Sequence, residues 1–335
     1  MVETQAATGG RDSGRMAGLW RCVMAMLFVT GGTGYLGSAL VELLVREGYE
    51  VRALVRTPEK AVVLPEGVER YAGDISDEDH LAKGMEGCEG VFHFAATMGG
   101  TWAEAREGNN RSTGRVLKAA RRAGVRRVVY TSSSAAIIRP DGLVSEQAEV
   151  NETALEDVYS ATKMESEAFV YEAFWNGQDA NIVNVVNAYG PSPAGAKSYN
   201  MLFLAAAAGK VPCVVDAQVA WVLAEDVARC HLLAFEKGEP GKRYIACGEV
   251  ATFPQVLGKF NELWGASPEI EVLPPGSDIP RDRLWGHAIR SEVYGKLGPM
   301  RIDDAQARAL GFAPKGLDEG LRETVEWLRG IGAAG

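Results

Sequence analysis

A tyrosine and a lysine four residues apart are the side chains in this sequence best placed for proton transfer. Tyr159 and Lys163 fall within one helical pattern, so their side chains share a helix face. A free phenol has a pKa of about 10, and a positive charge about 4 Å away favours its ionised form. Lys163 is therefore expected to lower the pKa of Tyr159, which would let this phenol act as a general acid or base close to neutral pH.

A run of hydroxyl side chains precedes this pair, at the end of a predicted strand. Thr131-Ser132-Ser133-Ser134 follows the apolar run 128–130, and a long helix is predicted over 157–175. Open parallel sheets bind their ligands at the carboxyl ends of the strands. We therefore expect the serines, Tyr159 and Lys163 at one ligand-binding edge, which makes this common residue pair a candidate redox site.

A glycine-rich turn lies upstream, in Thr30-Gly31-Gly32-Thr33-Gly34-Tyr35-Leu36-Gly37. It follows an apolar run and opens an amphipathic segment. Glycines permit a tight turn and let backbone N–H groups approach a pyrophosphate, and a helix N-terminus adds free N–H groups and partial positive charge. This context predicts a dinucleotide-binding site.

The residue after the second predicted strand bears on the choice of dinucleotide. NAD-binding proteins place an acid about 20 residues after the glycine turn, whereas this sequence has Arg56 there. A guanidinium can clamp a 2′-phosphate through paired hydrogen bonds, and Lys60 could assist. The sequence therefore favours NADP over NAD. Asp74, after the third strand, is placed to accept a hydrogen bond from an adenine amino group.

Short β-rich runs alternate with helical patterns in the first half. Strands are predicted at 26–29, 51–55, 68–71, 91–94, 127–131 and 182–186, and helices at 35–47, 103–123 and 157–175. This alternation predicts an α/β fold, a Rossmann doubly wound parallel sheet.

Prolines break up the second half, which we expect to form a smaller C-terminal substrate lobe that closes with a helix over 317–329. The predicted organisation is a disordered tail over 1–25, an NAD(P)-binding Rossmann domain over 26–190 and a substrate-binding lobe over 191–330. The lobe is expected to be interleaved with the sheet, because 221–235 and 243–247 could return to it.

Composition argues against several other classes of protein. The 335 residues carry a net charge of −9, whereas proteins that bind nucleic-acid backbones present basic surfaces. No apolar run approaches the length needed to span a bilayer. Five cysteines without a Cys-x-x-Cys pair and four histidines without ligand spacing argue against a disulfide framework and a metal site, and they fit a reducing cytoplasm.

Further segments make the chain resemble the extended short-chain dehydrogenase/reductase family, within the NAD-dependent epimerase/dehydratase superfamily. The resemblance runs from about residue 26 to residue 329. The segments that carry it are Phe92-His93-Phe94-Ala95-Ala96, Asn109-Asn110-Arg111-Ser112-Thr113, Asn187-Ala188-Tyr189-Gly190-Pro191 and Ala224-Glu225-Asp226-Val227-Ala228. Ser112 departs from the family pattern, which has glycine at this position.

The resemblance implies a role for each candidate residue. Ser133 would hold a substrate carbonyl, with Ser134 as the alternative, and Tyr159 would be the acid–base. Lys163 would bind the nicotinamide ribose, and Asn109 would order a helix or relay water in the catalytic set. The residues expected to bind the cofactor are Gly31, Thr33, Gly34, Tyr35, Leu36, Gly37, Arg56, Lys60, Asp74, Ile75, Ala95, Ala96, Thr97, Tyr159, Lys163 and Asn187.

Within the family, residues 51–58 look most like the dihydroflavonol-reductase-like branch. Plant flavonoid reductases of that branch carry an asparagine five residues after the catalytic serine, where this chain has Ile138. A polyphenol substrate is therefore in doubt. The residues expected to contact substrate are Met98, Ser133, Ile138 and Tyr159. Met98, Trp102 and Ile138 could equally be packing residues.

Several functions stay open on the sequence alone. The leading one is an NADP-dependent reductase or dehydrogenase acting on a small-molecule carbonyl or alcohol. A nucleotide-sugar epimerase or dehydratase would want an acid near position 56 and cations for a diphosphate, for which Arg281, Arg283 and Arg290 are candidates. A 3β-hydroxysteroid-type dehydrogenase would suit an apolar pocket. A non-catalytic NADP-binding sensor is a different class.

The family also implies a homodimer through the helices predicted at 103–123 and 157–175.

Overall fold

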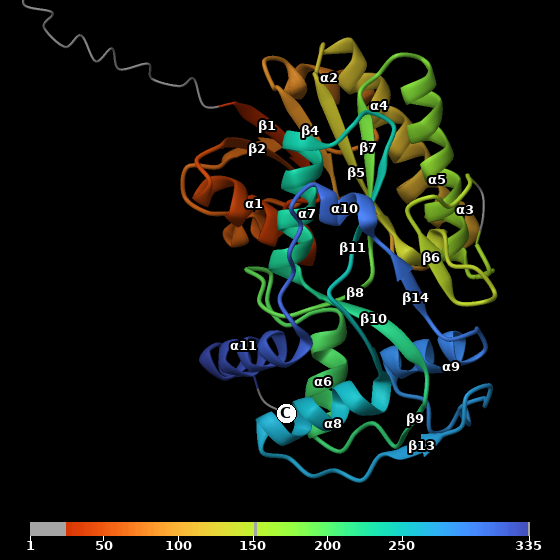
Figure 1. Ribbon diagram of the computed structural model, residues 1–335. Coiled ribbons are helices and arrows are strands. Elements are labelled where there is room, and N and C mark those ends of the chain that lie inside the picture. Colours follow the sequence, from red (N-terminus) through yellow and green to blue (C-terminus); the bar gives the residue numbers. More distant parts are fainter. Residues whose placement is uncertain (1–24, 151–152, 334–335) are drawn as a thin grey trace, which may run out of the picture.

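The computed structural model describes residues 25–150 and 153–333, so all but the last residue of the predicted tail lies outside the described residues. The main element is a seven-stranded sheet in the order β11-β7-β5-β4-β1-β2-β3 (Figure 1). All its strand pairs are parallel. The strands are β1 (Met26–Thr30), β2 (Glu50–Val55), β3 (Glu69–Ala72), β4 (Gly90–His93), β5 (Arg127–Ser133), β7 (Ala180–Val185) and β11 (Arg243–Ala246).

Helices cover both faces of this sheet. α1 (Tyr35–Arg46) and α7 (Ala224–Lys237) pack together on one face, and α2 (Glu78–Met85), α4 (Ser112–Arg122) and α5 (Val158–Trp175) lie on the other (Figure 1). Strand β1 is buried on both sides: Leu27 and Val29 face the first group, and Phe28 faces the second. This is why the strands read as continuous apolar runs rather than as alternating patterns.

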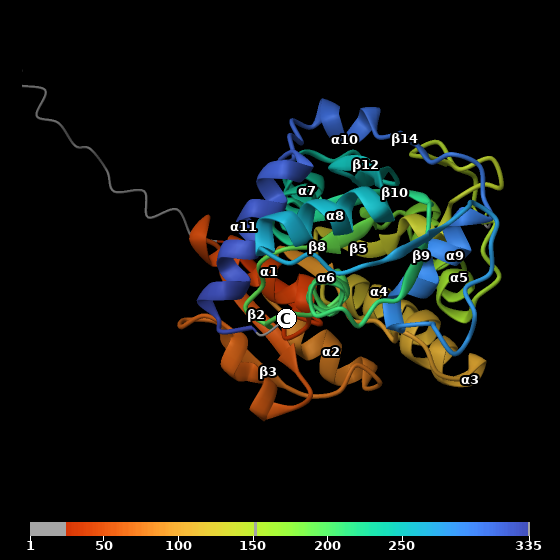
Figure 2. The same cartoon turned by 90° about the horizontal axis from the view of Figure 1, so that it is seen from below.

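The remaining elements of the described residues form a lobe at the carboxyl edge of the sheet, with a short strap beside it (Figure 2). A three-stranded sheet, two further strand pairs and five helices make up this part of the described chain. The elements are β8 (Asn187–Tyr189), β10 (Gln218–Leu223), β12 (Glu249–Thr252), β9 (Cys213–Val215) paired with β13 (Glu271–Leu273), β6 (Leu143–Ser145) paired with β14 (Arg301–Asp303), α6 (Tyr199–Ala207), α8 (Phe253–Trp264), α9 (Ile289–Gly295), α10 (Ala305–Ala309) and α11 (Leu317–Gly330).

The predicted fold class is confirmed: this is a Rossmann doubly wound parallel sheet. Strand order reverses between β1 and β4, because β2 and β3 extend to one side of β1 and β4 and β5 to the other. Such a reversal opens a crevice at the carboxyl ends of the strands. Strand β11 and helix α7 come from the second half of the chain and still join the large sheet.

The single helix predicted over 103–123 is three consecutive pieces. α3 (Trp102–Ala105) runs into a π-helical turn, Arg106–Arg111, and then into α4. Within the turn, Gly108 lies so close to Thr97 that an added Cβ would stand 1.9 Å from the threonine Oγ1. The wide turn therefore brings the helix backbone onto the loop after β4, a contact that local periodicity does not reveal.

None of the helices in the described parts of the chain is long and apolar enough to cross a membrane.

Candidate active site

A cavity of about 680 Å³ lies between the carboxyl ends of the strands and the lobe. Residues from the glycine turn, from the ends of β4, β5 and β7, from α5 and from α9 line it. Eleven of the predicted site residues are among them: Gly31, Gly34, Tyr35, Leu36, Gly37, Ala96, Met98, Ser133, Tyr159, Lys163 and Asn187. Thr33, Ala95 and Thr97 are chain neighbours of lining residues without lining the cavity themselves.

The glycine turn has the tightness that a phosphate cradle requires. Gly31 adopts φ 73°, and a Cβ there would stand 2.5 Å from the backbone nitrogen of Ala95. A Cβ on Gly37 would stand 2.2 Å from the Gly31 carbonyl oxygen. Helix α1 begins directly after Gly34, which has no side-chain cap, so its first N–H groups face the cavity end of the helix. These residues fit a dinucleotide pyrophosphate.

Tyr35 also ties the two halves of the protein together. Its hydroxyl donates to the Gly190 carbonyl oxygen at 2.9 Å and accepts from Asn200 Nδ2 at 3.1 Å. Burial raises the pKa of this phenol, so it stays neutral. The tyrosine after the glycine turn therefore fixes the loop that follows β8 over the cofactor side of the cavity.

Ser133 and Tyr159 meet at the cavity wall. Ser133 ends β5 and Tyr159 lies in the first turn of α5, and both line the cavity with the Ser133 hydroxyl near enough to act on the Tyr159 phenol. Burial raises the pKa of Tyr159 to about 12, while the Ser133 hydroxyl and the positive charge of Arg290 act in the opposite direction. At neutral pH this phenol therefore holds its proton and is poised to donate it.

The ammonium of Lys163 is directed toward β5, which corrects the expectation that it lowers the pKa of Tyr159. It donates to the Thr131 carbonyl oxygen at 2.9 Å and to the Tyr130 hydroxyl at 3.3 Å. It also lies 4.9 Å from the centre of the Tyr130 ring. Burial lowers the pKa of Lys163 to about 8, and the carboxylate of Glu167 opposes this fall. In this structure the cation acting on Tyr159 is Arg290.

Asn109 is buried and holds neighbouring segments together. Its Oδ1 accepts from the Thr97 backbone nitrogen at 2.7 Å, and its Nδ2 donates to the Thr97 carbonyl oxygen and to Thr162 Oγ1. Asn109 is not among the described residues that line the cavity. These contacts suit the helix-ordering alternative, because they fasten the loop after β4 to α5.

Ile138 is a correction to the predicted substrate contacts. Its side chain is 1% exposed and packs in the main hydrophobic core, without lining the cavity. Met98, in contrast, lines the cavity and is 72% exposed. Trp102 is partly exposed and lies against the Arg106 guanidinium. Of the three apolar residues suggested for the substrate site, only Met98 is at the cavity.

The residues predicted for the adenosine end lie outside this cavity. Arg56 is exposed directly after β2, and its charge helps to lower the pKa of Asp74, on which hydrogen bonds from Ser76 act first. Lys60 is exposed in the short helical segment Pro58–Val63, and Ile75 packs under α2 and α4. Arg56 and Asp74 thus lie close enough to interact across the ends of β2 and β3, where an adenosine ribose would be expected.

The lobe contributes four cavity-lining residues that are not among the predicted substrate contacts. Tyr199 begins α6, His287 and Arg290 lie around the start of α9, and Tyr294 follows one turn later. The Tyr294 hydroxyl lies near enough to Ser134 for this serine to oppose the rise in the tyrosine pKa that burial causes, which places α9 beside the serine run. Only Arg290 had been considered for ligand binding, and no short spacing rule links these residues to the rest of the site.

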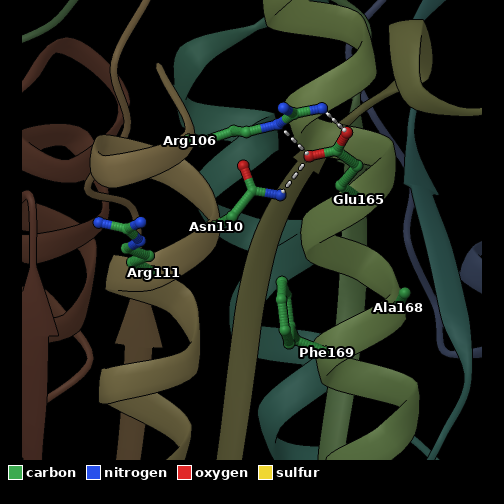
Figure 3. Close-up of a pocket in the computed structure, with 6 residues that line it drawn as sticks. All are labelled: Arg106, Asn110, Arg111, Glu165, Ala168 and Phe169. Atoms are coloured by element: carbon green, nitrogen blue, oxygen red, sulfur yellow. Dashed lines mark hydrogen bonds and ion pairs between the residues drawn. The ribbon is translucent and has the colours of Figure 1, made fainter. Parts of the chain in front are cut away.

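A second hollow lies on the outer surface, between the π-helical turn and α5 (Figure 3). Glu165 accepts two hydrogen bonds from Arg106 and one from Asn110, and the Phe169 ring points into the hollow below them. None of the catalytic candidates, Ser133, Tyr159, Lys163 and Asn109, lines this hollow.

No group of His, Cys, Asp or Glu that could hold a metal ion occurs among the described residues.

Comparisons with known proteins agree with this geometry. A model of the NAD dependent epimerase/dehydratase family matches residues 27–247. "Sterol demethylase protein B" of Methylococcus capsulatus is 33% identical over 90% of this chain and 97% of its own length. A "Putative dihydroflavonol 4-reductase" of Synechocystis is 30% identical over 93% of this chain and 97% of its own. The crystal structure of a UDP-glucose 4-epimerase from Thermotoga maritima superposes with a TM-score of 0.75 over 91% of this chain and 99% of its own, at 24% identity.

Proposed function

Since the chain belongs to the NAD-dependent epimerase/dehydratase family of extended short-chain dehydrogenases/reductases, we propose that it is an NADP-dependent reductase or dehydrogenase of a small-molecule carbonyl or alcohol. The observation that carries the proposal is the position of Ser133 and Tyr159 beside each other at the wall of a cavity that also contains the glycine turn. The direct test is oxidation of NADPH and of NADH with a panel of aldehydes, ketones and sterols.

The bound nicotinamide would supply or accept the hydride. In the reductive direction Ser133 donates a hydrogen bond to the substrate carbonyl oxygen, and Tyr159 gives that oxygen its proton. Lys163, which already lines the cavity, would turn toward the nicotinamide ribose and bind its hydroxyls. Tyr159 is partly buried at the cavity wall, so its hydroxyl can reach a substrate bound in the cavity.

The high pKa of Tyr159 predicts opposite pH dependences for the two directions of the reaction. Carbonyl reduction needs the protonated phenol, so its rate is expected to stay flat from about pH 6 to about pH 9. Alcohol oxidation needs the phenolate, so its rate is expected to rise throughout that range. Initial rates in both directions across this range check the prediction. An alcohol oxidation rate that is level above about pH 7 would contradict it.

Arg56 supports the choice of NADP. Its guanidinium is exposed after β2, where the adenosine ribose is expected, and it forms neither a hydrogen bond nor an ion pair within the described residues.

Arg56→Ser is expected to raise the KM for NADPH about 10- to 100-fold while leaving the KM for NADH within about threefold, because a hydrogen bond to a charged group is lost. Steady-state kinetics with both cofactors measure this. Arg46→Ser, which removes an exposed arginine of α1 paired with Glu225, is the control. Equal changes for NADPH and NADH would exclude a 2′-phosphate contact.

Two alternatives stay open. A nucleotide-sugar epimerase or dehydratase agrees with the fold of the Thermotoga protein, but Arg281 and Arg283 are paired with Glu292 and Glu271 rather than directed at the cavity. A 3β-hydroxysteroid-type dehydrogenase is supported by the relative described as a sterol demethylase protein. Product analysis with a sterol alcohol and with a nucleotide sugar distinguishes the two, since these substrates share no binding group.

We further propose a homodimer formed through α4 and α5, where Phe169 is 39% exposed and Trp175 is 70% exposed. Phe169→Glu is expected to weaken dimerisation at least about 30-fold, because it places a charge in an apolar contact. Light scattering over a range of protein concentrations measures the shift. Val62→Glu, a change at an exposed apolar residue beside β2, serves as the control. A wild-type protein that is monomeric throughout would refute the dimer.

Cytoplasmic location is a further part of the proposal. The four cysteines within the described residues, Cys88, Cys213, Cys230 and Cys247, are free and buried. Thiols in this state fit a reducing compartment.

A further inference from the structure

The charge inside the cavity is opposite in sign to that of the whole protein. Net charge is −9, yet no Asp or Glu is found among the described residues that line the cavity, whereas Lys163, Lys197 and Arg290 all line it. Lys163 lies on the cofactor side, on α5. Lys197 lies in the loop between β8 and α6, whereas Arg290 comes from α9, so Arg290 places positive charge on the lobe side of the cavity.

Arg290 differs from the two arginines that precede it. Arg281 makes a two-pronged contact with Glu292, at 3.0 and 2.9 Å, and Arg283 contacts Glu271 at 2.6 Å. Arg290 has a single ion-pair partner within the described residues, Asp157, at 3.5 Å. Charge-assisted hydrogen bonds are normally about 2.7–2.9 Å long, so the guanidinium donors lack a close acceptor.

The guanidinium is open to the cavity. The Arg290 side chain is 23% exposed and lines the cavity, so its donors without a close protein acceptor are available to a ligand. Asp157 does not need Arg290, because its carboxylate already accepts from Ser160 Oγ at 2.6 Å and from the Ser160 backbone nitrogen at 3.2 Å. Arg290 can therefore turn to another acceptor without leaving a stranded carboxylate.

We propose that Arg290 binds an oxyanion carried by the substrate, a carboxylate or a phosphate, beside the carbonyl that Tyr159 protonates. This inference rests on the proposed function and specifies its substrate class. Arg290 and Tyr159 line the same cavity, and Asp157, the partner of Arg290, is two residues from Tyr159. The anionic group therefore lies near the reacting carbon. Lys197, which is exposed, extends the positive charge toward the solvent.

Binding of small probes to the full chain with saturating NADP⁺ tests the site without turnover. Benzoate is expected to bind about 10- to 100-fold more tightly than neutral benzamide in titration calorimetry, because charged hydrogen bonds carry such factors. Arg290→Met should abolish this preference, and Arg290→Lys should keep part of it. Arg283→Met, which removes a surface arginine outside the cavity, should leave it unchanged. Equal binding of benzoate and benzamide, or a preference that survives in Arg290→Met, overturns the proposal.

Two further experiments identify the oxyanion and test the anion site independently of the reductase function. Pyrophosphate that binds more tightly than benzoate, and depends on Arg290, supports the site and assigns it to phosphate. With NADPH, 4-formylbenzoate should exceed its methyl ester in kcat/KM by about 10-fold or more, and Arg290→Met should remove the difference. If neither aldehyde is reduced but benzoate binding still depends on Arg290, the reductase function fails and the anion site stands.

Discussion

Tyr159→Phe is expected to lower kcat for carbonyl reduction by about 10³-fold, with little change in cofactor affinity or in the unfolding temperature. General acid catalysis contributes factors of about 10² to 10⁴, and the substitution removes the only atom of Tyr159 that can transfer a proton. The Ser133 hydroxyl remains and can still polarise the carbonyl, which leaves a residual rate. Single-turnover oxidation of NADPH with the best aldehyde of the substrate panel measures the loss.

Two comparisons make this result specific. Tyr49→Phe removes a phenol hydroxyl that donates to Glu236 on the surface, and it should keep wild-type turnover. Titration of NADPH fluorescence should show that the Tyr159→Phe protein binds cofactor normally. A sensor that only reports the NADP level would keep its function in the variant. A variant with wild-type turnover would therefore remove Tyr159 from the mechanism and favour a non-catalytic role.

Features that depend on short sequence spacings were predictable from the chain. The glycine turn must lie between β1 and α1, because only glycine tolerates φ 73° at Gly31 and the close approach to Ala95. Apolar runs without alternation indicated strands buried on both faces, and the resulting parallel sheet is confirmed. The serine run and the start of α5 meet at one edge, because a parallel sheet places the carboxyl ends of all its strands at the same edge.

The direction of individual buried side chains was not predictable in the same way. Helix periodicity places Lys163 and Tyr159 on one face, but the ammonium follows the nearest acceptors, the Thr131 carbonyl and the Tyr130 hydroxyl, on a neighbouring strand. Ile138 lies in the core because the segment after Ser133 turns inward, which no pattern around it reveals. Arg290 reaches the cavity through packing of α9 on the serine run, a contact between residues more than a hundred positions apart.

A buried ion pair beneath the catalytic edge gives the largest expected effect on stability. Glu167 and Arg243 contact each other at 2.7 Å, and their side chains are 2% and 0% exposed. Asn184 Nδ2 donates both to Glu167 Oε1 at 2.7 Å and to the Ser133 carbonyl oxygen at 2.9 Å. Arg243 lies on β11, so this network joins the strand from the second half of the chain to α5 and to Ser133.

Glu167→Leu is therefore expected to lower the free energy of unfolding by about 3–5 kcal/mol, because it leaves a guanidinium charge buried without its carboxylate. Urea unfolding of the full chain measures the loss. The same change removes the carboxylate that keeps the pKa of Lys163 from falling further below about 8. Cofactor binding by the variant should consequently weaken as the pH rises toward this value, because the ammonium loses its charge.

The double variant Glu167→Leu/Arg243→Met separates the cost of a stranded charge from the value of the pair itself. Replacing both partners of a buried pair with apolar side chains is often close to neutral, so the double variant should be more stable than Glu167→Leu alone. Asp179→Asn provides a matched comparison, because the Asp179 side chain is 23% exposed and Arg127 keeps its contacts with the Ala234 and Phe235 carbonyl oxygens. It should lose about 1–2 kcal/mol. If Glu167→Leu costs no more than Asp179→Asn, the buried network is not what fastens β11 to the catalytic edge.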